Sequence, residues 1–191
     1  MKPFLKVIQL HKNQTQLIKK ASQNNREAQQ ALYNWHAPKM LSVCRYYIKD
    51  VHHAEEAMLN GFLKVFTELK TFENKGSFEG WIRRIMVRES ISFLRQKKQV
   101  VFVEVDDCTT TASPLSSEEN LAVDDIQNLI DNLPEGYKMV FVMSAIEGYK
   151  HHEIANILKI SEGTSKSQLY KARQLLQQQL NALNSDTYGI Q

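Results

Sequence analysis

Apolar residues recur at steps of three and four positions over most of the chain, and this spacing is the strongest constraint on its fold. Because an α-helix turns once every 3.6 residues, such steps gather the apolar side chains on one face. The pattern predicts helices at 14–22, 26–48, 52–70 and 78–96, and again from residue 116 onward. The 191 residues include only 7 Gly and 4 Pro, so turns are few. The sequence therefore predicts an all-α fold.

The second half of the chain carries clear signals for where helices begin and end. Ser116, with Glu119 three residues later, can form a capping box at the start of a helix. Pro134 ends that helix and can open the next at its first turn. The next helix is expected to run to Glu147, and Gly148, directly after it, is expected to terminate it.

Charge is divided unevenly along the chain, although the net charge is only +3. Residues 1–98 carry 18 Lys and Arg against 8 Asp and Glu, a net +10, whereas residues 99–135 carry 9 acidic residues and no basic one. Residues 136–191 carry 6 basic and 4 acidic residues, a net +2. This distribution indicates separate pieces. We expect two helical bundles, residues 1–98 and 117–191, joined by a flexible acidic linker over 99–116.

The composition also indicates the cellular compartment. No apolar run approaches the length needed to span a membrane, and the N-terminus is too polar for a signal peptide. Cys44 and Cys108 are isolated from each other, which fits reduced thiols and gives no metal-ligand spacing. We expect a soluble cytoplasmic protein without membrane insertion.

Metal and enzymatic chemistry have little support in the sequence. The two His-His pairs, 52–53 and 151–152, have no Cys nearby. The stretch "HHE" lacks the second His one turn further on that a zinc-peptidase helix requires. No nucleophile–base pair and no phosphate-binding Gly loop is recognisable. We therefore expect no metal, no cofactor, no catalytic residue and no enzymatic activity.

Residues 151–173 have the spacing of a helix-turn-helix: a short helix, a polar turn with Gly163, and a longer helix. The second helix of such a motif enters the major groove, where short hydroxyl and cationic side chains suit phosphates and base edges. An ordinary helical pair with a solvated face has the same spacing, and these residues alone leave both readings open. The candidate DNA-binding residues are Ser161, Thr164, Lys166, Ser167, Tyr170 and Lys171.

A second candidate region joins a polar aromatic loop to a basic helix. Residues 81–98 carry six basic side chains against one acid, Glu89, and such a helix can neutralise phosphates. Aromatic faces beside amide and hydroxyl groups in the preceding loop are what an unstacked base needs. Phe78 and Trp81 are more often core residues, so Asn74 and Lys75 are the better candidates for direct contact. The candidate set is Phe72, Asn74, Lys75, Ser77, Trp81, Arg83, Arg84 and Arg88.

Together the two regions resemble the bacterial RNA polymerase sigma factors of the extracytoplasmic-function (ECF) type. The stretch "AEEAMLNGFLKVFTELKTFENKGSFEGWIRRIMVRESISFLR" looks like their second conserved region. The stretch "LPEGYKMVFVMSAIEGYKHHEIANILKISEGTSKSQLYKAR" looks like their fourth and is the more specific match. The resemblance covers residues 14–98 and 117–183, in the order and two-domain layout typical of this type.

The resemblance implies a role for each part. The helix at 54–66 would dock on core RNA polymerase, at the clamp coiled coil of the β′ subunit, and further contacts would involve the β subunit. The loop 72–78 would capture a flipped base of the minus-ten element, and helix 81–98 would hold the duplex edge. The positions from 164 to 171 would read the minus-thirty-five element of promoter DNA, and the acidic linker would follow a basic channel of the polymerase. Members of this type are often held by an anti-sigma protein.

The polymerase-docking helix departs from the family pattern. Its implied docking residues are Glu55, Glu56, Leu59, Asn60 and Phe62. The family usually has Gln and Glu where this chain has Leu59 and Asn60, which alters the polar details of docking. Arg88, on the basic helix, stands where many members carry Asn.

Two alternatives to a sigma factor remain open from the residues. A stand-alone helix-turn-helix regulator would bind duplex DNA tightly without polymerase. A helical scaffold that sequesters a protein partner would show no DNA dependence. The charge of only +2 on residues 136–191 argues against strong autonomous DNA binding and favours a polymerase-dependent protein.

Overall fold

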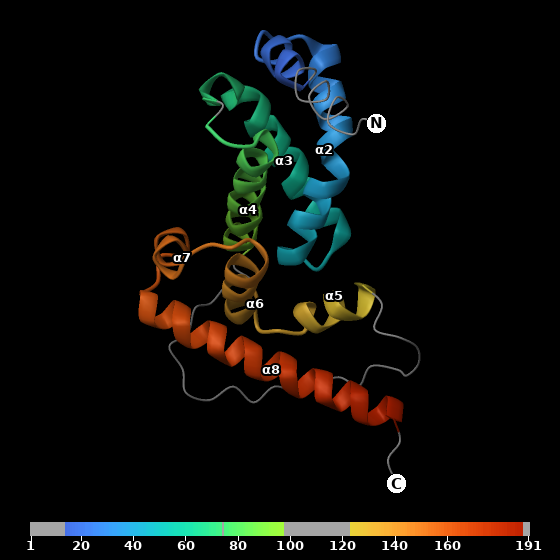
Figure 1. The fold of residues 1–191 in the computed structure, drawn as a ribbon, viewed down its shortest axis with the longest axis vertical. Coiled ribbons are helices and arrows are strands. Elements are labelled where there is room, and N and C mark those ends of the chain that lie inside the picture. The colour runs from blue at the N-terminus through green and yellow to red at the C-terminus, as the bar shows by residue number, and fades with distance from the viewer. Residues whose placement is uncertain (1–13, 74, 98–122, 189–191) are drawn as a thin grey trace, which may run out of the picture. The chain divides into compact units, whose positions relative to one another are not determined.

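The computed structural model describes residues 14–73, 75–97 and 123–188. Within these ranges every regular element is helical and none is a strand (Figure 1). The predicted all-α fold is confirmed. None of the described helices is long and apolar enough to cross a membrane.

The chain forms two compact units, one within residues 1–93 and the other within residues 94–191. The predicted acidic linker, 99–116, falls within the second of these ranges and lies outside the described residues, as do Ser116 and Glu119 of the predicted capping box. The linker and the bounds assigned to each domain stay predictions.

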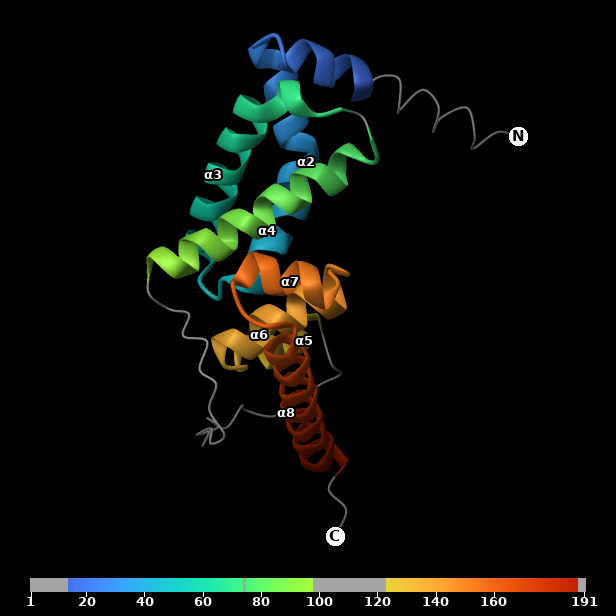
Figure 2. The ribbon, with the colours of Figure 1, turned by 90° about the vertical axis from the view of Figure 1, so that its left-hand side faces the viewer.

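The N-terminal unit consists of helices whose bounds follow the apolar periodicity closely. A helix at 14–21 precedes α2 (Arg26–Tyr47) and α3 (Val51–Glu68). The short 3-10 helix η1 (Leu69–Thr71) then leads into the loop before α4 (Phe78–Gln96). Figure 2 shows α2, α3 and α4 forming the body of this unit.

Side-chain caps fix where the first two long helices begin. Asn25 Oδ1 accepts the Ala28 N–H at 2.9 Å ahead of α2, and Asp50 Oδ1 accepts the His53 N–H at 2.9 Å ahead of α3. Each bond satisfies a backbone donor that the helix itself leaves unpaired. The bond from the His53 N–H also lowers the pKa of Asp50.

The core of this unit requires a close approach of α3 to α4. Fully buried side chains include Leu32 and Met40 on α2 and Ile82 and Met86 on α4. A Cβ placed on Gly61 of α3 would lie 2.3 Å from Met86 Sδ, so the absence of a side chain at 61 makes room for the methionine. This packing holds α4 and the loop before it in a defined position.

The C-terminal unit contains α5 (Val123–Asp131), α6 (Glu135–Phe141), the π-helical turn η2 (Val142–Ile146), α7 (His151–Leu158) and α8 (Glu162–Tyr188). Helices α6 and α7 both pack against α8. The short helix, turn and long helix predicted for 151–173 are confirmed.

The predicted continuous helix up to Glu147 is only partly right, because its last turn is π-helical. The Glu147 N–H donates to Val142 O, and the Tyr149 N–H donates to Met143 O, both at 2.9 Å. A π turn accommodates one extra residue, and apolar periodicity does not reveal it. Gly148 follows with φ +75°, a left-handed backbone that suits glycine, so the predicted end of this helix is confirmed.

Candidate nucleic-acid interface

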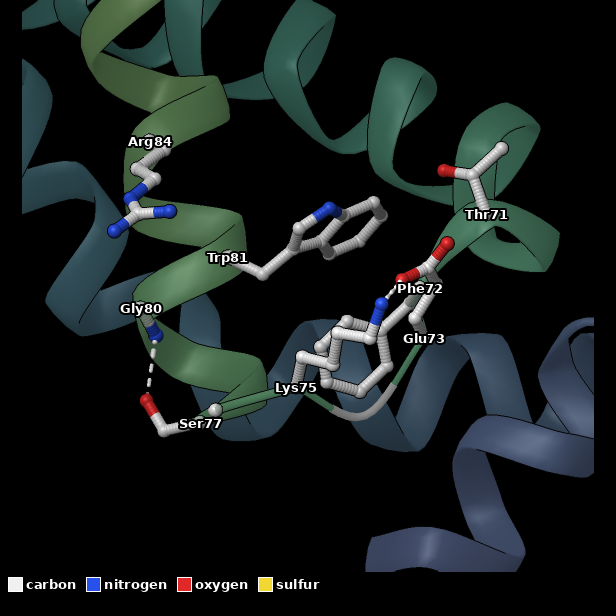
Figure 3. A pocket seen from close by; sticks show the side chains of 9 residues that line it. Thr71, Phe72, Glu73, Lys75, Ser77, Gly80, Trp81 and Arg84 are labelled. Atoms are coloured by element: carbon white, nitrogen blue, oxygen red, sulfur yellow. Dashed lines mark hydrogen bonds and ion pairs between the residues drawn. The ribbon is translucent and has the colours of Figure 1, made fainter.

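The loop between η1 and α4 opens into a hollow with a volume of about 360 Å³. Figure 3 shows its lining, with the Trp81 ring projecting from α4 toward Thr71 at the end of η1. Gly76 enables the turn, since its φ of +108° is one that L side chains rarely adopt. We call this site the base hollow, and its lining residues are Thr71, Phe72, Glu73, Lys75, Gly76, Ser77, Gly80, Trp81 and Arg84.

Three aromatic rings form one wall of the base hollow. Phe72 lies 5.1 Å from Phe78 and 5.4 Å from Trp81, between ring centroids, and Phe78 lies 5.8 Å from Trp81 in a stacked arrangement. Such contacts fix the ring orientations. Phe78 is buried, as expected of a core residue, whereas Trp81 and Phe72 are half-buried and line the hollow. The prediction that both rings are core residues is therefore confirmed for Phe78. It is only partly right for Trp81, which is half-buried.

A buried histidine supports this wall from behind. The His36 ring, on α2, meets Phe78 edge to face at 5.6 Å and is only 3% exposed. Gln14 Nε2 donates a hydrogen bond to His36 Nε2 at 3.3 Å. Burial lowers the pKa of His36, so the neutral ring, which can accept this bond, is favoured. Helix periodicity can place His36 on the buried face of α2, together with Leu32 and Met40. It does not reveal the contact of His36 with Phe78, which lies on another helix.

The polar groups of the hollow differ in how they are engaged. Ser77 Oγ accepts the Gly80 N–H at 2.9 Å and so caps the start of α4. The exposed Lys75 pairs with Glu73 at 2.6 Å. An exposed pair of this kind contributes little to stability, so Lys75 can exchange Glu73 for a phosphate. Arg84 is exposed beside the hollow.

The basic helix presents cations along its outer side. Arg84 and Arg88 are exposed and Arg83 is half-buried. Both acids of α4 are paired: Glu89 with Lys64 of α3 at 2.5 Å and Glu79 with Lys39 of α2 at 2.9 Å, so their charges are already compensated. The outer side of α4 therefore offers positive charge next to the base hollow. Asn74, the proposed contact at the loop tip, lies outside the described residues.

The docking candidates on α3 fall into two groups. Glu55, Glu56, Leu59 and Asn60 are all exposed. Phe62 is 3% exposed and packs edge to face on a ring of α2, so it is a core residue rather than a direct contact. The prediction that Phe62 itself contacts the polymerase is therefore wrong, because Phe62 lies on the face of α3 that is buried in the core.

The structure adds an apolar contact that the sequence reading missed. Leu63 is 65% exposed, one turn after Leu59, which is 54% exposed. Residues four apart share a helical face, so the two leucines form one apolar strip on the outside of α3. The sequence contains a signal for this strip, because Leu59 and Leu63 are apolar residues four positions apart that lie outside the buried face of α3.

The turn between α7 and α8 is closed by local bonds. Lys159 has the left-handed backbone, φ 58°, that commonly ends a helix. Ser161 Oγ then accepts the Thr164 N–H at 2.9 Å and so caps the start of α8. His151 Nδ1 lies 2.8 Å from Ser165 Oγ and joins α7 to α8. The hydroxyl of Ser161 is therefore engaged in the turn, and it also shares a hydrogen bond with the Thr164 hydroxyl, 2.8 Å away, in which either group can donate.

The first turns of α8 present the predicted polar row. Lys166, Ser167 and Tyr170 are exposed, while Thr164 and Lys171 are partly buried. Tyr170 is 64% exposed and its hydroxyl accepts a bond from Gln174 at 2.9 Å. On the opposite side Leu169 and Ala172 are buried, as the apolar stripe predicts. We call this set, residues 164–171, the α8 row.

The remaining histidines give no sign of a metal centre. His52 lies 3.8 Å from Glu55, and His53 lies 3.5 Å from Asp50, in each case within one helical turn. In the part of the chain that the structure describes, no group of three His, Cys, Asp or Glu side chains is placed to hold a metal ion.

Two family models match the chain, one in each unit. Sigma-70 region 2 matches residues 32–100, and sigma-70 region 4 matches residues 124–176. The first match contains the base hollow and the basic helix, and the second contains the α8 row.

Curated relatives and solved structures agree with these matches. The chain is 29% identical over 134 residues to the RNA polymerase sigma factor SigV of Bacillus subtilis, covering 70% of this chain and 80% of SigV. It is 25% identical over 179 residues to the ECF RNA polymerase sigma factor SigW of the same species, covering 87% of this chain and 96% of SigW.

Two solved structures share the fold. One is CnrH in complex with the cytosolic domain of CnrY, with a TM-score of 0.51, 19% identity, and coverage of 87% of this chain and 96% of that one. The other is the sigma factor RpoE in complex with the anti-sigma factor NepR from Bartonella quintana, with a TM-score of 0.53, 20% identity, and coverage of 80% and 96%. From the matched regions and these relatives, the chain belongs to the sigma-70 family as an ECF RNA polymerase sigma factor, which acts in promoter-directed transcription initiation.

Proposed function

We propose that the two units divide promoter recognition between a melted base and a duplex. The N-terminal domain, for which we propose residues 1–98, captures an unstacked base of the minus-ten element in the base hollow. The C-terminal domain, for which we propose residues 117–191, reads the minus-thirty-five element through the α8 row. Residues 99–116 connect the two as an acidic tether, which a positively charged channel of the polymerase would attract.

The observation that carries this proposal is the exposed part of the Trp81 ring in an open hollow beside cationic side chains. Stacking of a base on an aromatic ring contributes about 1–3 kcal/mol. Unstacking a base from the duplex costs a few kcal/mol, so Trp81 alone does not offset it. Phosphate contacts from Arg84 and Arg88 supply the remainder. Melting is then driven by binding energy, and no nucleotide hydrolysis is required.

The α8 row supports duplex recognition by the types of side chain that it exposes. Lys166 and Lys171 suit phosphates or guanine edges. The Ser167 hydroxyl, which donates to Thr164 O at 3.0 Å, can accept a bond, and the Tyr170 hydroxyl, which accepts from Gln174, can donate one. Residues 136–191, which include this row, have a net charge of only +2, which is low for strong binding to DNA. The C-terminal unit is therefore expected to act as one of two weak contacts on a promoter-bound polymerase.

We further propose that α3 docks the protein on core RNA polymerase, at the β′ clamp, with further contacts to the β subunit. The exposed residues Glu55, Glu56, Leu59 and Asn60 would take part, with Leu63 extending the apolar strip. Of the two solved structures of similar fold, one holds the cytosolic domain of CnrY and the other the anti-sigma factor NepR. We accordingly propose an anti-sigma protein as a regulatory partner. We also propose that the protein acts in the cytoplasm and has no enzymatic activity.

The experiment that tests this proposal is run-off transcription with purified core polymerase on a promoter library, with and without the protein. We expect start sites that depend on the protein and share two sequence elements. A complete lack of protein-dependent starts would contradict the proposal. Tight binding of the free protein to duplex DNA would instead favour a stand-alone regulator, although the region 2 match in the N-terminal unit is not expected of that class.

A further inference from the structure

Helices α7 and α8 are joined at both ends of α7, and only one of these joints lies in the turn between them. At the C-terminal end of α7, the Ile160 N–H donates to Ala155 O at 3.1 Å, beside the left-handed backbone of Lys159. At the N-terminal end, His151 Nδ1 lies 2.8 Å from Ser165 Oγ, which is 14 positions further along the chain. Figure 1 shows α7 beside the first turns of α8. The function proposed above gives this His151–Ser165 pair no role.

The apolar contacts between the two helices constrain their relative direction less sharply than this pair does. Ile154 and Leu158 of α7 are buried, as are Leu169 and Ala172 of α8. The burial of apolar surface is non-directional, so a small tilt of one helix on the other changes it little. A hydrogen bond, in contrast, weakens steeply once its angle leaves the preferred range. The pair therefore adds a directional contact to a non-directional interface.

The burial of Ser165 makes the pair difficult to replace. Ser165 is 0% exposed, so its hydroxyl has no ready access to water as an alternative partner to His151. The nearest substitute is a backbone carbonyl of its own helix, which Ser residues within helices can use. A hydroxyl donates as well as accepts, so it can pair with the ring nitrogen whether or not that nitrogen carries the proton.

The two joints are far enough apart to define the tilt between the helices. Helix α7 has 8 residues, and at about 1.5 Å of rise per residue its two ends lie about 10 Å apart. One joint alone would allow α7 and α8 to pivot about it. Two joints at this separation fix the direction of one helix against the other.

Ser165 lies in the turns of α8 that carry the exposed side chains of the α8 row. It stands between Thr164 and Lys166 in the chain but faces inward. Because a helix moves as a unit, a rotation or tilt of α8 that breaks the pair also displaces the outward side chains of these turns. In a helix-turn-helix, contact with base edges depends on how the second helix enters the groove.

We propose that His151 and Ser165 are positioning residues for the reading of the upstream element. Their hydrogen bond sets the tilt of α8 against α7 and so directs the α8 row at the base edges. This inference rests on the proposed reading of that element by the α8 row. Correct positioning of the row is needed to discriminate between sequences, whereas attraction to phosphates is common to all DNA.

The test measures sequence discrimination by full holoenzyme on a promoter obtained from the run-off library. The affinity for this promoter is divided by the affinity for the same DNA with a scrambled upstream element, at one fixed salt concentration. A variant that only lowers the folded fraction of the protein reduces both affinities by the same factor and leaves this ratio unchanged. A variant that misdirects the α8 row lowers the ratio.

His151→Leu and His151→Asn form a matched pair, because the two new side chains have nearly the same size and shape. The Asn amide carries a polar atom on Cγ, where His carries Nδ1, so His151→Asn should retain the ratio. His151→Leu and Ser165→Ala should each lower the ratio about fivefold, the effect of one lost hydrogen bond. The double variant, His151→Leu with Ser165→Ala, should lower it no further, since both changes remove the same bond.

Ile154→Val is the control for a loss of stability. Ile154 is fully buried on α7, and the loss of one methylene group lowers the free energy of unfolding without removing either member of the pair. It should leave the ratio unchanged. If Ser165→Ala fails to fold, the half-buried position of His151 makes His151→Leu the deciding variant.

The outcomes separate this inference from the proposed function. An unchanged ratio in His151→Leu, or an equal loss of the ratio in Ile154→Val and His151→Leu, overturns the positioning role and leaves the α8 row standing. An unchanged ratio in Lys171→Ala combined with Ser167→Ala overturns the reading of the upstream element by the α8 row, and this inference with it.

Discussion

The base hollow and the α8 row are both candidate DNA contacts, but they are built in different ways. The α8 row is a set of side chains on consecutive turns of one helix, and its turn is closed by a bond within four residues, from Thr164 to Ser161. The base hollow needs η1, a loop and α4, with His36 of α2 packed behind its wall. Helix geometry alone orients the first site, whereas tertiary packing creates the second.

This difference indicates a difference in task. A rigid helix face suits a duplex, whose grooves have a regular shape. A hollow with an aromatic wall suits a base that has left the stack and must be held away from its partner. Mutations should therefore separate recognition of the duplex from opening of it.

The largest expected effect is on the base hollow. Trp81→Ala should shorten the open-complex lifetime roughly thirtyfold, because it removes a stacking surface of about 2 kcal/mol. Binding of the closed duplex should change little. Footprinting at low temperature measures the closed complex, and challenge with heparin measures the open one.

Trp35→Ala is the control for that experiment. Trp35 is also a partly exposed tryptophan, 44% exposed, but it lies on α2 and does not line the base hollow. It should leave the open-complex lifetime within about twofold of the wild type. Equal losses in the two variants would show that aromatic area in general, rather than the hollow, holds the strand.

The next largest effect is expected on the α8 row. Lys171→Ala combined with Ser167→Ala should weaken recognition of the upstream element about tenfold, since it removes one cation and one hydroxyl from the exposed side. Affinity for core polymerase should stay the same. Promoter affinity and polymerase affinity are measured separately, by footprinting and by fluorescence anisotropy of labelled protein.

Arg173→Ala combined with Gln177→Ala is the matched control on the same helix. Both residues are exposed but lie on another side of α8 from Ser167 and Lys171. This double variant loses the same charge and should retain upstream recognition. If it lost recognition equally, the effect would come from net charge and not from the α8 row.

A smaller effect is expected for Asn74→Ala. An amide at the loop tip is proposed to hydrogen-bond the captured base, and its loss should shorten the open-complex lifetime about fivefold, or roughly 1 kcal/mol. Initial duplex capture should change less than opening. A larger loss in capture than in opening would assign Asn74 to the duplex instead of the melted base.

The smallest effect concerns the support of the aromatic wall. Burial lowers the pKa of His36 below its usual value of 6.5, so the folded protein keeps this ring neutral. Below pH 6.5 the unfolded chain takes up a proton at His36 that the folded protein does not. The free energy of unfolding should therefore fall as the pH drops through this range, by up to about 1.4 kcal/mol per pH unit, and typically less.

Comparison with His36→Phe isolates this contribution from that of the other histidines. Above pH 7 the two proteins should show no pH-dependent difference in the free energy of unfolding. Between pH 6.5 and 5.5 the wild type should lose more of it than the variant. Parallel curves over the whole range would mean that protonation of His36 does not affect stability.

Much of this architecture was predictable from the sequence. The apolar steps of three and four predicted helices whose bounds agree with α2, α3, α4 and α7 to within one or two residues. The cap at Ser161 and the outward row that follows it were predictable as well. These features are local, since they depend on helix periodicity and on bonds between residues a few positions apart.

The sequence by itself therefore determined an all-helical chain with a basic first part, an acidic joint and a polar row on its last long helix. Only the tertiary structure decided that the helix from Glu135 ends in a π turn and that Trp81 is left half open beside Phe78. The physical reason is that periodicity defines which face of a helix is buried, but not which edge of that face a neighbouring helix covers. That last choice depends on side chains from elsewhere in the chain, such as His36 behind Phe78 and Met86 beside Gly61.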